Sequence, residues 1–483
     1  MDQADADQAD GGDEQRAADR HRWQALGVCL VVGFMTLLDI SIVNVALPSI
    51  EKGLHASSAE LSWVISGYAL TFGLVLVPAG RFGDARGRRT VFLLGLALFT
   101  LASAACGLAT GPVFLVVARL AQGLAGGLLT PQVSGLIQEL FQGAERGRAF
   151  GLFGTTIGIS TAVGPLLGGL LIAAFGEHSG WRWVFFVNLP IGVGAFVAAA
   201  RLLPVRPRDR RTPVRGNSDP LGVLLLGAGV VALLLPLVQE QQWHGSAKWA
   251  LIPVSLVLLT CFVLWERRQG RRGRAPIVDL RLFRQRSYAL GAVVALVYFA
   301  GFTAIFFIFT LYLQNGRGYS ALEAGAAVTP FALGSAVSSA VGGRLVARYG
   351  RRLITLGLAM VAAGLGCSVL AVHQVPGHAA GLATALPLLL AGFGSGFVIA
   401  PNQTVALSEV PVRWAGSAGG VLQTGQRIGS ATGIAAVSSV FFSRLAASHG
   451  DWARAFEAGV LTALAFVVAA LVIALVDLRT CRA

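Results

Sequence analysis

Apolar runs separated by short polar segments fill almost the whole chain. Each run holds about 20 residues, the length that an α-helix needs to cross a hydrocarbon core of about 30 Å. Fourteen such spans are recognised, at roughly 25–47, 60–80, 90–110, 113–134, 148–175, 183–203, 220–238, 249–266, 288–313, 322–345, 353–372, 382–407, 415–442 and 457–478. The runs are continuous and do not alternate between apolar and polar residues, which is not the pattern of a transmembrane β-barrel. The predicted fold class is an all-α polytopic membrane protein.

Basic residues indicate on which side of the membrane each loop lies. With the N-terminus inside, 30 of the 38 lysines and arginines fall in inner segments and six in outer loops, while Arg119 and Arg427 fall within spans. This excess on one side predicts an even number of spans and two cytoplasmic termini. The charge count does not separate fourteen spans from twelve, because the number of spans stays even when the middle pair at 220–238 and 249–266 is left out.

Composition narrows the function classes. Only 13% of the residues are charged and 55% are hydrophobic, whereas soluble domains carry about 25% charged residues. The net charge of +14 resides in short loops, so we expect no nucleic-acid partner. The five cysteines are scattered singly and the seven histidines lie in tails or loops, so we expect no metal site and no cofactor. Without a P-loop or a nucleophile elbow, we predict neither an enzyme nor an ATP-driven pump.

A basic hairpin follows the second span and recurs in the second half. Residues 80–89 carry four arginines and one aspartate, and residues 343–352 repeat the pattern, weakened, 263 residues later. The repeat predicts two six-helix halves that move about a joint, with two further helices inserted between them. Transporters built from such parallel halves hold their substrate near the membrane midplane.

Four regions follow from this division. We predict a disordered cytoplasmic tail at 1–22, an N-terminal six-helix bundle at 23–203, two inserted helices with basic cytoplasmic loops at 204–286, and a C-terminal six-helix bundle at 287–479. The prediction for the tail rests on its acidic, polar composition. The oligomeric state is left open, with a monomer as the working expectation.

Two opposite charges lie within spans of the first half. Asp39 belongs to the first span and Arg119 to the fourth, at similar depths. A carboxylate at the centre of a spanning helix raises the free energy of membrane insertion by about 2.5–3.5 kcal/mol, so we expect it to have a function. We interpret the two residues as a proton-sensitive pair. A static structural ion pair is the alternative.

Further polar side chains interrupt apolar helices. Lipid cannot satisfy their hydrogen bonds, so we expect them to face a water-filled cavity; hydrogen bonding between helices without substrate contact is the alternative. The candidates for a substrate cavity are Asn44, Gln122, Asn402, Gln403, Gln423, Gln426 and Arg427.

The fifth span contains glycines four residues apart and a proline. Such glycines allow helices to approach closely, and the proline permits a bend. The residues concerned are Gly158, Gly164, Pro165 and Gly168. Tight packing without a further role is the simpler interpretation.

Five motifs in order resemble the major facilitator superfamily, specifically its fourteen-helix drug:proton antiporter branch. They lie at 39–48, 80–89, 119–123, 158–169 and 181–190. The resemblance implies alternating access in a bacterial cytoplasmic membrane, where protons enter as a drug or metabolite leaves. It also implies a role for Arg119 in proton coupling, an antiporter motif at 158–169, and a conformational gate made by Gly80, Gly83, Asp84, Gly87 and Arg88.

The second hairpin departs from the motif, because Ala347 stands where the first has Asp84. The resemblance therefore does not extend gating to the second copy. The preferred function is a proton-coupled exporter of hydrophobic small molecules, and the deep carboxylate is compatible with cationic ones. The alternatives are an exporter dedicated to one endogenous metabolite or antibiotic and, from another class, a non-transporting membrane receptor or scaffold.

Overall fold

The computed structural model describes residues 3–204, 219–239, 243, 245–272, 274, 276–375, 377 and 379–480, with side chains for all of these except 3–15, 17, 321 and 480. Within these ranges the chain forms helices and no β-strand. Fourteen helical segments are long and apolar enough to cross a membrane. They include the middle pair that the loop charges left undecided, at Pro220–Val238 and Ser246–Arg271. The predicted fold class is confirmed.

The first half contains seven α-helices, and the last two together make its sixth span. They are α1 (Gln3–Leu54), α2 (Ser58–Arg86), α3 (Arg88–Gly107), α4 (Pro112–Leu140), α5 (Gly143–Phe175), α6 (Gly180–Phe186) and α7 (Asn188–Leu202). The inserted pair is α8 (Pro220–Val238) and α9 (Leu251–Arg271). The basic loop at 205–218, predicted from the sequence, lies outside the described residues.

The second half follows the same plan. Its helices are α10 (Arg286–Leu311), α11 (Ala321–Tyr349), α12 (Arg351–Gln374), α13 (Ala380–Ala383), α14 (Ala385–Ala406), α15 (Ala415–Ala447) and α16 (Trp452–Thr480). We call the side of the membrane on which α1 begins and α16 ends the inner side.

The N-terminal segment differs from its prediction. Residues 1–22 were expected to be disordered, but α1 continues as a helix back to Gln3. Five alanines, three glutamines and three arginines, all good helix formers, lie within residues 1–22, so the first span can propagate beyond the bilayer without an apolar face.

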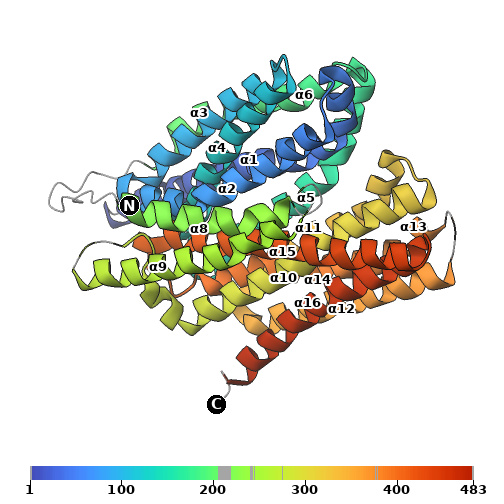
Figure 1. Ribbon diagram of the computed structural model, residues 1–483. Helices are drawn as coiled ribbons and strands as arrows, with labels where there is room; N and C mark the ends of the chain where they lie inside the picture. Colours follow the sequence, from blue (N-terminus) through green and yellow to red (C-terminus); the bar gives the residue numbers. More distant parts are fainter. Residues whose placement is uncertain are drawn as a thin grey trace.

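The two halves form two bundles that lie against each other (Figure 1). A buried apolar cluster fills the first half and continues into the second at the inner side through Tyr288, Leu407 and Leu422. The second half has its own cluster around Phe309, Leu358 and other buried side chains. The halves therefore share a buried apolar core at the inner side.

The inserted helices cover the seam between the halves, where Figure 1 shows α8 and α9 in front of both bundles. Leu226, Val230 and Leu234 of α8 pack with Val77 of α2 and Ala431 of α15. The pair thus contacts one helix from each half.

Equivalent helices begin and turn in the same way. Ser57 and Glu60 form a capping box at the outer start of α2, and Ser320 and Glu323 form one at the start of α11. Each serine accepts a backbone N–H that the helix itself leaves unpaired. The same capping interaction therefore begins the equivalent helices of both halves, as the repeat predicts.

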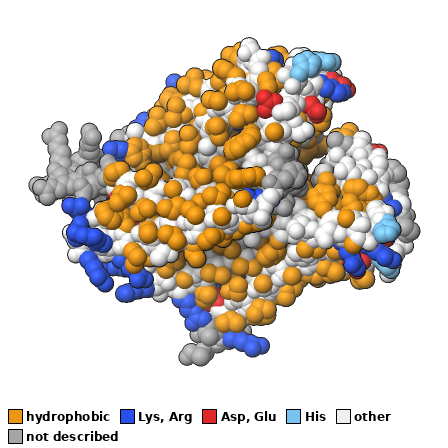
Figure 2. Space-filling model, in the orientation of Figure 1, with side chains coloured by type: hydrophobic (Ala, Val, Ile, Leu, Met, Phe, Trp, Pro, Cys, Tyr) orange, Lys and Arg blue, Asp and Glu red, His pale blue; other side chains and the backbone are white. Residues whose placement is uncertain are grey.

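The outer surface is that of a membrane protein. Large apolar side chains such as Leu101 and Leu256 are exposed on it, each by 68%. Figure 2 shows such side chains over most of the visible face, with arginine clusters near the N-terminal end, and a notch between the bundles at the opposite end. The distribution agrees with lipid around the waist and a structure closed at the inner side.

Candidate functional site

An ion pair forms the buried polar centre of the first half. Arg119 Nη1 lies 2.6 Å from Asp39 Oδ2, and the two side chains are 2% and 0% exposed. Helix α1 supplies the carboxylate and α4 the guanidinium. Arg119 also donates from Nε to the carbonyl oxygen of Val64 at 3.1 Å. The structure places together the two residues that the sequence singled out.

Two amides complete the surroundings of Asp39. Gln122 Nε2 and Asn188 Nδ2 each donate to Asp39 Oδ1 at 2.9 Å. Arg119 Nη1 donates in turn to Gln122 Oε1 at 2.7 Å, and Asn188 donates to Ser103 Oγ at 3.1 Å. Both amide side chains are fully buried. Gln122 therefore belongs to the ion-pair network.

Asn188, like Ser103, is a member of this network that the sequence interpretation missed as a site residue. It begins α7 immediately after the break at Val187 that separates α6 from α7. The break lies within the stretch 181–190. Asn188 places an amide within an apolar span, as Gln122 does, so the sequence contained the same signal for both residues. Only the packing of the sixth span against α1 shows that Asn188 faces Asp39.

A small cavity of about 40 Å³ lies on the other side of Arg119. Arg427 reaches it from α15, its Cζ 4.5 Å from the centre of the Phe72 ring. Arg119 Cζ lies 4.2 Å from the centre of the Tyr68 ring. The lining consists of Ile40, Val43, Asn44, Ile65, Tyr68, Ala69, Phe72, Arg119 and Arg427. Asn44 and Arg427, both predicted cavity residues, are therefore brought together.

Other predicted cavity residues lie elsewhere. Gln403 and Gln423 both donate to Ser134 Oγ at 3.0 Å, so they join α14 and α15 to α4 at the inner side. Asn402 donates to the carbonyl oxygen of Gly291 at 2.9 Å within the second half. Gln426 is half-buried on α15 and does not line the cavity. The first three side chains make the helix-to-helix hydrogen bonds that were the alternative interpretation.

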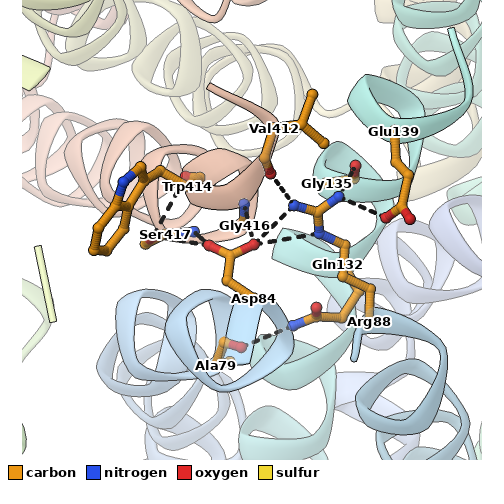
Figure 3. A network of polar contacts seen from close by, with 10 residues as sticks. All are labelled: Ala79, Asp84, Arg88, Gln132, Gly135, Glu139, Val412, Trp414, Gly416 and Ser417. Carbon is orange, nitrogen blue, oxygen red and sulfur yellow. Dashed lines mark hydrogen bonds and ion pairs between the residues drawn. The ribbon is translucent and has the colours of Figure 1, made fainter. Parts of the chain in front are cut away.

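The inner side is closed by a polar network between the halves (Figure 3), centred on Asp84 and Arg88. Asp84 Oδ2 accepts from the backbone N–H of Ser417 at 2.8 Å and from its hydroxyl at 2.9 Å, while Oδ1 accepts from the N–H of Gly416 at 3.0 Å. Arg88 Nη2 lies 2.9 Å from Asp84 Oδ1. We call this the inner network.

Arg88 extends the inner network to a third helix of the first half and adds a second contact with the other half. Its Nη1 donates to the carbonyl oxygen of Gly135 at 2.7 Å and to Glu139 Oε2 at 2.8 Å, both in α4. Its Nη2 also donates to the carbonyl oxygen of Val412, just before α15. The Asp84 and Arg88 side chains are 0% and 2% exposed, so the charges are removed from water and mutually satisfied.

The chemistry of the inner network follows from where α15 begins. Gly416 and Ser417 lie in the first turn of α15, where backbone N–H groups have no partner within the helix. A carboxylate placed there both accepts those N–H groups and meets the positive end of the helix dipole. Asp84 therefore caps a helix of the opposite half.

Glycines make this contact sterically feasible. A Cβ at Gly80 would collide with the carbonyl oxygen of Gly416, and one at Gly83 would collide with Gln132 Oε1. Gly87 has φ of +100° and is the single residue between α2 and α3. The first two permit close approach and the third permits the hairpin turn.

The glycines of α5 serve two contacts. A Cβ at Gly158 would lie 2.9 Å from the carbonyl oxygen of Ala332 in α11, the opposite half. Gly164 and Gly168 lie against Ser41 and Ile42 of α1 instead. Pro165 lies between Gly164 and Gly168 within α5. The run therefore brings α5 close to the helix that carries Asp39 and to a helix across the seam.

A sequence model described as Major Facilitator Superfamily matches residues 29–434. The chain belongs to the major facilitator superfamily. The probable actinorhodin transporter of Streptomyces coelicolor is 38% identical over 88% of this chain and 73% of its own length. The puromycin resistance protein of Streptomyces alboniger is 35% identical over 96% of this chain and 93% of its own.

Solved structures of the superfamily share the fold. The human organic anion transporter MFSD10 superposes with a TM-score of 0.68 at 14% identity, over 94% of this chain and 99% of that one. At this identity the likeness concerns the fold alone. The chain is thus a multi-pass membrane transporter of this superfamily and not an enzyme.

Among the described residues, no three His, Cys, Asp or Glu side chains gather as ligands of a metal ion would. The groups gathered at these places are an ion pair with two amides, two guanidinium groups over aromatic rings, and a network of hydrogen bonds that joins the halves.

Proposed function

We propose that this chain is a proton-coupled antiporter that exports hydrophobic small molecules, antibiotics among them, across a bacterial cytoplasmic membrane. The inner side would then face the cytoplasm. The proposal takes the export of antibiotics from the names of its relatives, one a probable actinorhodin transporter and the other a puromycin resistance protein. Proton coupling is supported by one observation in particular, the fully buried Asp39.

Asp39 suits a proton carrier because its charge is balanced within one half. Its partner Arg119 and both amides that bind it, Gln122 and Asn188, come from the first half. Protonation would break the ion pair and loosen α1 from α4 without touching the seam. A proton that crosses about 100 mV releases about 2.3 kcal/mol, which can drive export against a gradient.

Asp84 suits a gate because it acts across the seam. The inner network joins α2 to the first turn of α15, so the inner side cannot open until these hydrogen bonds break. Loading cargo from the cytoplasm would require that opening, and release would require the closed inner side seen here. The two carboxylates thus have separate tasks under this proposal.

Inverted membrane vesicles test the coupling, because export becomes uptake into the acidified interior. With a panel of aromatic antibiotics, wild-type protein should accumulate at least one compound when the gradient is imposed. Asp39→Asn should lower that uptake to the rate without a gradient, while Asp39→Glu, which keeps a titratable group, should retain part of it. Glu457→Gln, an exposed carboxylate on α16, serves as the control and should behave as wild type.

Each contrary result has a clear meaning. Gradient-driven uptake that survives Asp39→Asn in folded, monodisperse protein would rule out Asp39 as the coupling group. Uptake of a single compound from the whole panel would favour an exporter dedicated to one metabolite. Binding without any transport would favour the receptor or scaffold.

A further inference from the structure

The cavity beside Arg119 carries an uncompensated positive charge. Its lining includes Arg119 and Arg427 but no carboxylate. Arg119 is already paired with Asp39. No ion pair joins Arg427 to an acidic side chain in the part of the chain that the structure describes; its neighbour is the Phe72 ring. The net charge that faces the cavity is therefore positive.

Flat groups surround this charge. The rings of Tyr68 and Phe72 are stacked, with centroids 5.9 Å apart and an interplanar angle of 27°. A guanidinium group lies over each ring, Arg119 over Tyr68 and Arg427 over Phe72. Aromatic rings and guanidinium groups both present planar faces against which another aromatic system can stack.

The position of the cavity suits a transported molecule. Phe72 is the midpoint of α2, which runs from Ser58 to Arg86, and Arg427 comes from α15 in the other half. The contact between them therefore crosses the seam at mid-membrane depth. The present volume of about 40 Å³ holds no more than a few water molecules. A larger molecule needs α2 and α15 to separate, as alternating access requires.

We propose that the exported molecules are flat aromatic acids whose carboxylate or phenolate binds Arg427. This inference rests on the proposed export function and specifies its cargo. An acidic group would replace the Phe72 ring as the partner of Arg427 by a charge-assisted hydrogen bond, while the aromatic body stacks on Tyr68 and Phe72. A cationic molecule would be repelled, because the balancing carboxylate, Asp39, lies behind Arg119 and is 0% exposed.

Cargo and proton then occupy different places. Asp39 takes the proton within the first half, and Arg427 takes the cargo from the second, so exchange depends on movement of the halves and not on competition for one carboxylate. An inside-negative potential of about 100 mV also favours the outward movement of each negative charge by about fiftyfold.

Binding of two xanthene dyes to purified full-length protein in nanodiscs, without any gradient, tests the charge preference. The anion fluorescein should bind at least about tenfold more tightly than the cation pyronin Y, since a hydrogen bond to a charged group carries that much preference. Arg427→Gln should remove the difference and Arg427→Lys should keep most of it. Arg444→Gln, the same change at an exposed position farther along α15, should leave it unchanged.

Several results would overturn the inference. Pyronin Y binding as tightly as fluorescein to the wild type would do so and needs no variant. So would an unchanged preference in folded Arg427→Gln, or the lack of saturable fluorescein binding below about 1 mM. None of these would contradict proton-coupled export, and loss of coupling in vesicles would not alter the dye preference.

Discussion

The two hairpins at the inner side, between α2 and α3 and between α11 and α12, make the same helix contact with different chemistry. In the first, Gly80 approaches Gly416 of α15; in the second, Gly343 approaches Gly147 and Gly151 of α5. Each hairpin turns on a single glycine of positive φ, Gly87 or Gly350. Backbone packing across the seam is thus nearly symmetric.

The charges are not symmetric. Asp84 caps the first turn of α15, whereas its counterpart Ala347 is exposed and contributes no charge. The arginine after each turn also differs, because Arg88 binds across the seam while Arg351 pairs with Asp477 of its own half at 2.7 Å. The first hairpin ties the halves together by charge, through Asp84 and Arg88.

The positions at which the opposing helices begin explain the difference. Helix α15 starts at Ala415, so its free N–H groups lie at the crossing. Helix α5 starts at Gly143, four residues before Gly147 and eight before Gly151, so the N–H groups of both residues at its crossing are already bonded within the helix. A carboxylate at position 347 would find no donor of that kind. The comparison teaches that a carboxylate can join the halves where the opposing helix begins, because free N–H groups are available there.

The largest effect is expected from Asp84→Ala. It removes three hydrogen bonds to α15 and one partner of buried Arg88, and loss of one member of a buried pair costs about 3 kcal/mol or more. The inner side should open in a large share of molecules, and export should fall at least tenfold. Spin labels at exposed Thr90 and Arg352 would report the change as a longer distance. An unchanged distance would show that Asp84 does not hold the seam.

Gly80→Ala and Gly343→Ala should have smaller, matched effects. Either methyl group would meet a backbone carbonyl across the seam, and overpacking of this kind costs about 1–3 kcal/mol. The same label pair should lengthen to a similar extent in both variants. If only Gly80→Ala had an effect, the packing at the two crossings would not be equivalent. Gly366→Ala, where a Cβ meets nothing within 4 Å, is the control.

The smallest effect is expected from Ala347→Asp. The position is exposed and offers no unpaired helix N–H, so we expect a change in export of less than about twofold, typical of an exposed substitution. The same substitution should fail to rescue Asp84→Ala. A rescue, measured by transport and label distance together, would contradict the explanation from helix starts.

Much of this protein was readable from the pattern of its residues. The length of the apolar runs determines the spans, and the charge of the loops determines their direction. The offset between the two hairpins reveals the two halves. Each of these signals depends on local sequence and on the thickness of a bilayer. The juxtaposition of Asp39 with Arg119 was also predictable, since two opposite charges at equal depth in one bundle need each other.

Tertiary structure alone decided which way each remaining polar side chain faces. Gln403, Gln423 and Arg427 all interrupt apolar helices, yet two of them join helices at the inner side and the third lines the cavity. A rotation of one residue, about 100°, changes the neighbour of a helix position. That rotation is set by how glycines and large side chains of other helices pack, which hydropathy along a single chain does not contain.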